Sequence, residues 1–232
     1  MWDTLFDQLG TIMLDNSVTE QSKCSCLETL RYICEDLTVD NINVTMSSSI
    51  MMTILYSLQT TMPSSIRQQG IQALNAALDY ADQFMQSPEQ CTRVMEGVLS
   101  CCQDTDEDVQ LHAIICLNGV FECFYEKLDP YIQTFYLVCK GKIENYTDPK
   151  VAIQAAFALE TLAQTELSLM SDQPCLNLVR RIGEELVAVL CTAMTKQDED
   201  DDGETMTVSI AAATCLASYC EVLGNGMTMM NQ

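Results

Sequence analysis

Six carboxylates lie within the seven residues Asp198–Glu204, the densest group of potential ligand atoms in the sequence. Acids at the first, third and fifth positions, with Gly203 at the sixth, follow the first half of an EF-hand calcium loop. The twelfth position of such a loop requires a bidentate Glu, and here it is Ser209. We therefore predict no specific calcium site. Because like charges resist burial, we also predict an exposed acidic loop at residues 197–205.

His112, the only histidine of the chain, is a second candidate for chemistry. Leu111 and Ala113 flank it in an apolar helical pattern, and no nucleophile motif with Ser or Cys accompanies it. The sequence also lacks a Gly-rich phosphate loop and the G-x-S-x-G and H-E-x-x-H motifs. We expect His112 to have a structural or surface role, and we expect no enzyme activity, no cofactor and no metal site.

The thirteen cysteines suggest either disulfides or a buried set of thiols. Their number is odd, and most sit in apolar helical patterns such as Ile114-Ile115-Cys116-Leu117. Cys24-x-Cys26 and Cys101-Cys102 lack the C-x-x-C pairs and histidines of a zinc site. Since buried Cys behaves as a small hydrophobe, we expect reduced core thiols in a cytosolic or nuclear protein.

The charge of the chain is strongly negative, with 33 acids against 11 bases and a net charge of −22. Such a surface repels phosphate backbones, so we expect no direct binding of nucleic acid. It attracts and steers basic partners, and the rate of their association falls as salt rises. Apolar runs are far too short for a membrane span, so we expect no membrane insertion.

A nine-residue pattern recurs along the chain, with an aliphatic residue, a small one four later, an apolar one five later and Leu eight later. Its copies are Ile66–Leu74, Val109–Leu117, Val151–Leu159 and Val208–Leu216, with a weaker one at Ser22–Leu30. The final leucines are spaced by 44, 43, 42 and 57 residues. A period near 40–47 residues is typical of HEAT and armadillo repeats, and the offsets within the pattern place its members on one helix face.

These repeats predict an all-α, right-handed HEAT solenoid of antiparallel helix pairs. Each pattern marks the second (B) helix of a pair, and the first (A) helices are expected near Trp2–Leu14, Ser47–Thr61, Glu89–Gln103, Pro130–Ile143 and Leu176–Met194. The chain is then a single solenoid of five repeats, at about 1–40, 41–84, 85–127, 128–170 and 171–226. Insertions at Glu166–Pro174 and Lys196–Thr207 lengthen the last interval.

The acidic segment and the first helices resemble a known family. Thr195-Lys196-Gln197 followed by the acidic run resembles the acidic loop of the importin-β (karyopherin-β1) family. The segments Trp2–Leu9 and Leu27–Asp36 resemble two helices of the same family in the same register. The resemblance runs along the whole chain and implies about repeats four to eight of a longer nuclear transport receptor. It also implies work in the cytoplasm and nucleus and at the pore of the nuclear envelope.

In that family the acidic loop contacts the Ran GTPase, and the B helices hold the basic N-terminal segment of importin-α. The resemblance implies that the loop here binds these partners or other basic cargo. The residues that match the loop are Asp198, Glu199, Asp200, Asp201, Asp202, Glu204 and Met206. The family has a Trp where this chain has Met206.

The family also binds FG-repeat nucleoporins in an apolar slot between A helices. The resemblance places this slot between the A helices of the second and third repeats. One wall is then Met51, Met52 and Leu55, and the other is Gln90, Arg93 and Val94. Met suits a surface that accepts Phe rings in several poses, whereas Arg93 stands where the family has an aromatic residue. The alternative is that Met51, Met52 and Leu55 belong to the core.

Two functions remain open from the sequence. One is a transport receptor that binds Ran, importin-α and FG nucleoporins. The other is a HEAT scaffold, such as a phosphatase regulatory subunit or an assembly platform. Both have the same fold, so the acidic loop and the apolar slot are the features that distinguish them.

Overall fold

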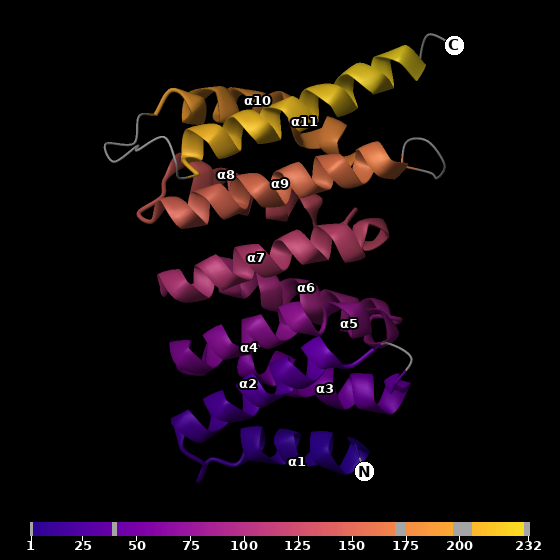
Figure 1. Cartoon of the computed structure of the whole chain (residues 1–232), viewed down its shortest axis with the longest axis vertical. Helices are drawn as coiled ribbons and strands as arrows, with labels where there is room; N and C mark the ends of the chain where they lie inside the picture. The colour runs from indigo at the N-terminus through magenta and orange to yellow at the C-terminus, as the bar shows by residue number, and fades with distance from the viewer. Residues whose placement is uncertain (1, 39–40, 170–174, 197–205, 230–232) are drawn as a thin grey trace. The chain divides into compact units, whose positions relative to one another are not determined.

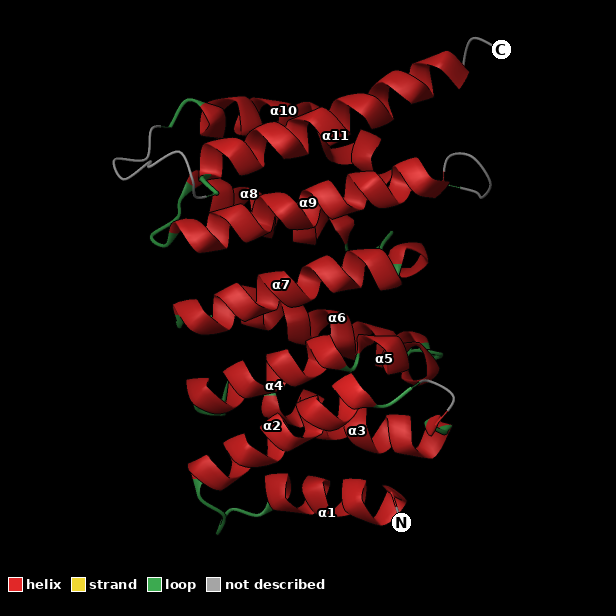
Figure 2. Cartoon of the chain, viewed as in Figure 1, coloured by secondary structure: helices red, strands yellow, loops and turns green. Residues whose placement is uncertain are grey.

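In the computed structural model, the described residues are 2–38, 41–169, 175–196 and 206–229. Within these ranges the chain forms eleven α-helices and one short 3₁₀ helix, without a strand (Figure 2). The prediction of an all-α chain is confirmed. Backbone contacts divide the chain into two compact units, 1–119 and 120–232.

Unit 1 consists of helices stacked in pairs (Figure 1). They are α1 (Trp2–Leu14), α2 (Glu20–Asp36), α3 (Val44–Ser57), α4 (Ser64–Ala76), α5 (Leu78–Phe84), α6 (Pro88–Cys102) and most of α7 (Glu107–Cys123). The A helix α1 packs on α3, and α3 contacts α6, whereas the B helix α2 packs on α4. The A helices therefore share one side of the unit, and each predicted A helix here overlaps an observed one.

The starts of these helices follow from side chains that accept backbone N–H groups. Thr19, Asn43 and Ser87 each accept a hydrogen bond from the N–H three residues later, at the starts of α2, α3 and α6. Asp106 does the same for α7 by accepting from the N–H groups of Asp108 and Val109. Short polar side chains thus act as the caps of these four helices.

The small residue of the repeated pattern allows close helix packing. Gly70 of α4 lies so near α3 that an added Cβ would meet Ser57 Oγ at 2.0 Å and Leu58 Cδ2 at 3.0 Å. The apolar members of the same copy, Ile66, Ile71 and Leu74, are buried. Burial of the patterned face therefore holds α4 against its neighbours.

The short helix α5 was not expected from the sequence. Its Tyr80 hydroxyl donates to the carbonyl of Cys34 at 2.8 Å and also to that of Leu37, and so satisfies the end of α2. In return, the carbonyl of Tyr80 accepts from Ser47 of α3 at 2.9 Å. These bonds tie α5 to two helices because carbonyls at a helix end lack partners within the helix.

Unit 2 repeats the paired arrangement. It contains the end of α7, a 3₁₀ helix at Tyr125–Lys127, α8 (Ile132–Glu144), α9 (Pro149–Leu169), α10 (Leu178–Met194) and α11 (Val208–Met229). The B helices α9 and α11 pack on each other, and each also packs on its own A helix, α8 or α10. α8 and α10 contact each other as well, so the two layers of A and B helices recur.

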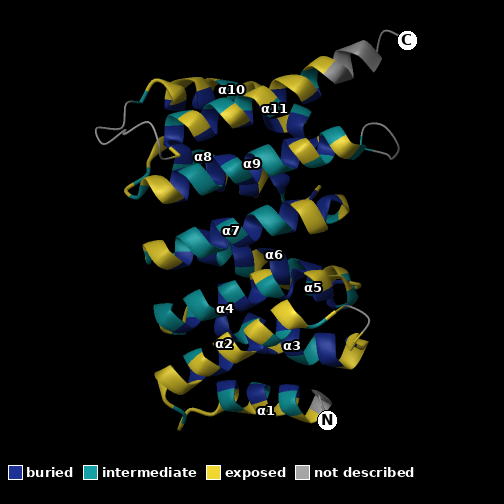
Figure 3. Cartoon of the chain, in the orientation of Figure 1, coloured by how far each residue is buried: buried dark blue, intermediate teal, exposed yellow. Residues whose placement is uncertain are grey.

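The core of each unit is lined by the inner faces of the helices, which are dark blue in Figure 3. Eight of the thirteen cysteines are buried, and all thirteen are free thiols. Burial raises the pKa of Cys101 and of Cys139 to about 12, so these side chains are neutral at pH 7. The prediction that most cysteines pack as small apolar residues is confirmed.

The first insertion begins later than the sequence suggested, because α9 continues to Leu169. Glu166 in its last turn is fully buried. Its carboxylate accepts from the Tyr125 hydroxyl at 2.6 Å, from the N–H of Leu178 and from the N–H of Val179 at 3.3 Å. Glu166 therefore serves as the cap of α10, in place of Asn177, which has a φ of 54° and makes no side-chain cap.

Candidate functional site

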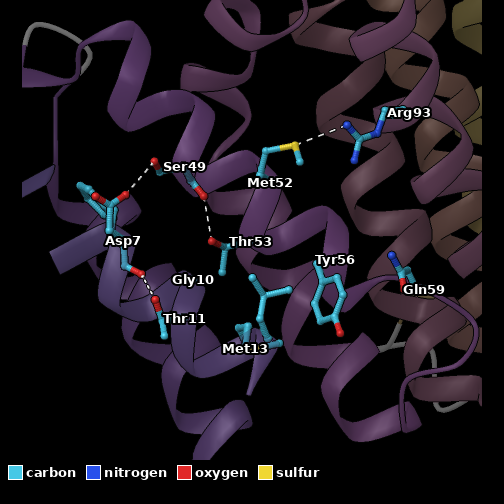
Figure 4. A pocket seen from close by; sticks show the side chains of 12 residues that line it. Asp7, Gly10, Thr11, Met13, Ser49, Met52, Thr53, Tyr56, Gln59 and Arg93 are labelled. Carbon is cyan, nitrogen blue, oxygen red and sulfur yellow. Dashed lines mark hydrogen bonds between the residues drawn. The ribbon is translucent and has the colours of Figure 1, made fainter. Parts of the chain in front are cut away.

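A pocket of about 420 Å³ lies in unit 1 between α1 and α3, with Arg93 of α6 at its edge (Figure 4). Its lining residues are Phe6, Asp7, Gly10, Thr11, Met13 and Leu14 from α1, and Ser49, Met52, Thr53, Tyr56 and Gln59 from α3 or just beyond it. The pocket is therefore a feature of the A-helix layer.

The floor of the pocket is apolar, and it is formed where α1 and α3 approach closely. Phe6 and Met13 are buried, and an added Cβ on Gly10 would lie 3.1 Å from Thr53 Oγ1. The hydroxyls of Thr11 and Thr53 both donate at 2.8 Å to backbone carbonyls of their own helices. These hydroxyl protons are therefore engaged and are not offered to a ligand.

The two ends of the pocket carry opposite charges. At one end Asp7 Oδ1 accepts from the Ser49 hydroxyl at 3.3 Å. At the other end Arg93 is exposed, and its Nη1 lies 3.4 Å from the sulfur of Met52. Figure 4 shows Met52 and Tyr56 between these two polar ends. A bound group therefore meets apolar side chains in the middle and a different charge on either side.

The structure brings together two of the six residues predicted for the FG slot. Met52 (45% exposed) and Arg93 meet at the surface, where Arg93 covers part of the thioether. Met51 and Val94 are fully buried, and Leu55 is 7% exposed. Gln90 is half-buried at the start of α6, where its side chain lies 3.0 Å from Ser87 Oγ. The open pocket lies between α1 and α3 rather than between α3 and α6.

The predicted acidic loop, 197–205, lies outside the described residues, and so do Asp198, Glu199, Asp200, Asp201, Asp202 and Glu204. The residues on either side of it are described. Lys196 Nζ donates to the carbonyls of Ile143 (3.3 Å) and Glu144 (3.0 Å) at the end of α8 and lies 4.7 Å from the Tyr146 ring centre. Met206, where the importin-β family has Trp, is exposed.

The chain is similar in sequence to importin subunit beta-1 of two yeasts. It is 24% identical to the Schizosaccharomyces pombe protein over 214 residues, or 86% of this chain. It is 26% identical to the Saccharomyces cerevisiae protein over 232 residues, or 94% of this chain. The chain spans about a quarter of the length of each, 24% and 27% respectively. No protein-family profile matches it.

Solved structures of importin β have the same arrangement of helices. A crystal structure of importin β superposes with a TM-score of 0.86 at 24% identity, over 95% of this chain and 27% of that one. The chain has the HEAT-solenoid fold of importin β. The Kap95:Nup1 complex (TM-score 0.83) and Kap95p with RanGDP (TM-score 0.82) are similar too, each at 24% identity over 93% and 92% of this chain and 26% of theirs.

Most of the pocket was not predicted from the sequence. The resemblance implied a slot between α3 and α6, whereas α1 supplies half of the observed lining. The sequence offers one signal: Leu14 is an apolar residue at the end of a predicted helix, next to Asp15. The structure shows that Leu14 is 60% exposed. An exposed Leu gains significance only when a neighbouring hollow is known.

His112 lies on the B-helix side of unit 1. It is half-buried at a polar hollow of about 300 Å³ that Arg31, Glu35 and Gln72 also line. Its Nδ1 lies 2.7 Å from the Asp108 carbonyl of its own helix. Among the described residues, no three His, Cys, Asp or Glu side chains are placed to hold a metal ion, and no helix is long and apolar enough to cross a bilayer.

Proposed function

We propose that the chain is a protein-binding part of a nuclear import receptor. It acts in the cytoplasm and nucleus and at the pore of the nuclear envelope. The observation that carries this proposal is the similarity to importin subunit beta-1 over 86% to 94% of the chain. A structural scaffold shares the fold, but the relatives found favour a transport receptor over a scaffold.

The acidic loop is proposed to bind the Ran GTPase and the basic N-terminal segment of importin-α or other basic cargo. Kap95p, a structural neighbour, has been solved with RanGDP. Asp198, Asp200 and the acids between and after them supply a concentrated negative charge beside the exposed Met206. Each exposed ion pair contributes little, so the cluster acts mainly through long-range attraction of a basic partner.

The A-helix layer is proposed to bind FG-repeat nucleoporins. Kap95 has been solved as a complex with Nup1. Met52 is the exposed thioether of the predicted slot, and Met51, Leu55 and Val94 would support it from below. Phe rings of an FG repeat would pack on Met52, since a flexible, polarizable side chain adapts to several ring poses.

We also propose that the chain works by binding rather than by catalysis, without a cofactor. Its relatives are named as importin subunits. The half-buried His112 has neither Ser nor Cys beside it in sequence, and its ring nitrogen bonds a backbone carbonyl of the preceding turn. That contact suits a structural role on α7.

The experiment that tests this function measures binding of the chain to three partners at low and moderate salt. They are Ran loaded with GTP, the basic segment of importin-α, and an FG-repeat peptide. We expect capture of the first two to weaken as salt rises, because charge steers them, and capture of the FG peptide to tolerate salt. Failure to bind any of the three at low salt would remove the proposal.

Two variants with matched charge assign the acidic loop its role. The first replaces Asp200, Asp201 and Asp202 by Asn. The second replaces Glu96, Glu122 and Glu221, which are exposed on α6, α7 and α11, by Gln. Both remove three negative charges and keep the helices. We expect only the first to weaken Ran and the basic segment strongly. Equal losses would show that net charge, and not the loop, attracts these partners.

Met52→Ser and Val44→Ser form the corresponding pair for the FG surface. Met52 is 45% exposed and Val44 is 63% exposed on the same helix. We expect only Met52→Ser to reduce retention of the FG peptide, because Val44 lies outside the predicted slot. Retention that is unchanged by Met52→Ser would exclude this surface from FG binding.

A further inference from the structure

The pocket between α1 and α3 overlaps the FG slot that the family resemblance implies only at Met52 and Arg93. That slot lies between α3 and α6, and three of its six predicted residues are buried. The pocket instead opens beside α1, with Gly10, Thr11 and Leu14 on one wall and Met52 and Tyr56 on the other. Nothing in the family resemblance assigns it a ligand.

We propose that this pocket binds a segment of a partner protein that combines an aromatic side chain with a nearby carboxylate. The aromatic ring enters the apolar middle of the pocket, and the carboxylate pairs with Arg93. This inference rests on the proposed function, because it specifies which partner chemistry the A-helix layer prefers.

The shape and lining of the pocket fit an aromatic side chain. Its volume of about 420 Å³ falls in the range of ligand sites, roughly 300–1,000 Å³. The exposed side chains at its rim, Leu14 and Met52, are flexible and apolar, and Tyr56 offers a ring for stacking. The hydroxyl protons of Thr11 and Thr53 are taken up by backbone carbonyls, so these side chains offer a ligand no hydrogen-bond donor.

The charges at the two ends fit a carboxylate on one side of that ring only. Arg93 has no carboxylate of the described residues within ion-pair distance, although the chain has three times as many acids as bases. It rests on the sulfur of Met52 instead. Asp7 at the opposite end would repel a second acid. A bound segment is therefore oriented with its carboxylate toward α6.

The test measures binding of capped Gly/Ser peptides that differ only in a central tripeptide, by fluorescence anisotropy at low salt. The tripeptides are Phe-Gly-Asp, Phe-Gly-Gly, Phe-Gly-Lys and Ser-Gly-Asp. We expect Phe-Gly-Asp to bind about threefold tighter than Phe-Gly-Lys, the size of effect typical of one exposed ion pair. Replacing Phe by Ser should weaken binding about tenfold or more, because the ring supplies most of the buried area.

Variants at Arg93 decide whether that residue reads the charge. Arg93→Gln should abolish the preference for Asp over Lys, and Arg93→Glu should reverse it. Both changes are at an exposed position and leave the core intact. A preference for Asp that survives Arg93→Gln, or equal binding of the Asp and Lys peptides by the unchanged chain, would overturn the inference.

A second pair of variants locates the pocket without changing charge. Leu14→Ser should weaken Phe-Gly-Asp severalfold, whereas Val44→Ser should not, although both residues are exposed and apolar. No effect of Leu14→Ser would place the peptide elsewhere and overturn the inference. Binding of Phe-Gly-Gly and of Ran without any effect of Asp or Arg93 would leave the proposed function standing and remove only this refinement.

Discussion

Glu166 offers the sharpest test of how the second unit is held together. It is an acid without a basic partner among the hydrogen bonds and ion pairs of the described residues, and it is fully buried. Its carboxylate accepts from the Tyr125 hydroxyl and from two N–H groups in the first turn of α10. We predict that Glu166→Ala destabilises the chain far more than Glu166→Gln does.

The magnitudes follow from the donors that each change leaves without an acceptor. A buried donor without its acceptor costs about 1–3 kcal/mol, and loss of a helix cap costs about 1 kcal/mol. Glu166→Ala leaves three such donors, some of which water reaches through the space created, so we expect a loss of about 3 kcal/mol. Gln keeps one carbonyl oxygen as an acceptor and no longer buries a charge, so about 1 kcal/mol is expected for it.

The pH dependence of the same residue gives an independent test. Burial raises the pKa of Glu166, and the hydrogen bonds from Tyr125 and from the backbone of Leu178 and Val179 only partly oppose this. The folded chain therefore holds the proton more tightly than the unfolded chain. The contribution of Glu166 to stability is full at low pH and falls as the pH rises from the unfolded pKa through the folded one.

The measurement is urea unfolding followed by helical circular dichroism, at several pH values between about 4 and 7, around the reference pKa of Glu. Glu184→Ala, at an exposed position of α10, is the control and should change little. Because Gln does not ionise, the stability difference between the unchanged chain and Glu166→Gln should move in favour of Gln as pH rises. A difference that is independent of pH, or equal losses for Ala and Gln, would refute this account of Glu166.

Three further predictions concern unit 1 and the glycines. The nearly buried pair of Arg67 and Asp104, joined by bonds of 2.6 and 2.8 Å, links α4 to the turn before α7, and Arg67→Leu should lower the free energy of unfolding by about 3 kcal/mol. Burial alone would raise the pKa of Asp104, but hydrogen bonds from Arg67 and the backbone lower it. Ionised Asp104 therefore stabilises the folded chain above the unfolded pKa, and this contribution is lost as the pH falls through the folded pKa. Asp104→Asn should flatten the acid side of a plot of stability against pH. Gly70→Ala must displace Ser57 and should destabilise by about 1 kcal/mol net, whereas Gly141→Ala, with no atom within 4 Å of the added Cβ, should stabilise by about 0.5–1 kcal/mol in thermal unfolding; the opposite order for the two glycines would contradict the packing described for α4.

The repeated pattern predicted the B helices because it depends only on local periodicity. Ile66, Ile71 and Leu74 recur at helical offsets, and all three are buried as the pattern requires. Which of Met51 and Met52 is exposed could not be predicted in the same way. Adjacent residues on a helix point about 100° apart, so the rotation of α3 against α1 and α6 decides which methionine reaches the surface. That rotation is set by packing across residues far apart in sequence.

Glu166 was placed in an insertion for a similar reason, since its partners lie 41 and 12 residues away along the chain. Its role becomes clear beside that of Lys196, which donates to two carbonyls at the end of α8. A carboxylate meets the N–H groups at one helix start, and an ammonium meets the carbonyls at another helix end. Both contacts match the partial charges of helix termini. A side chain at a described end of each predicted insertion is thus bonded to a helix terminus within unit 2.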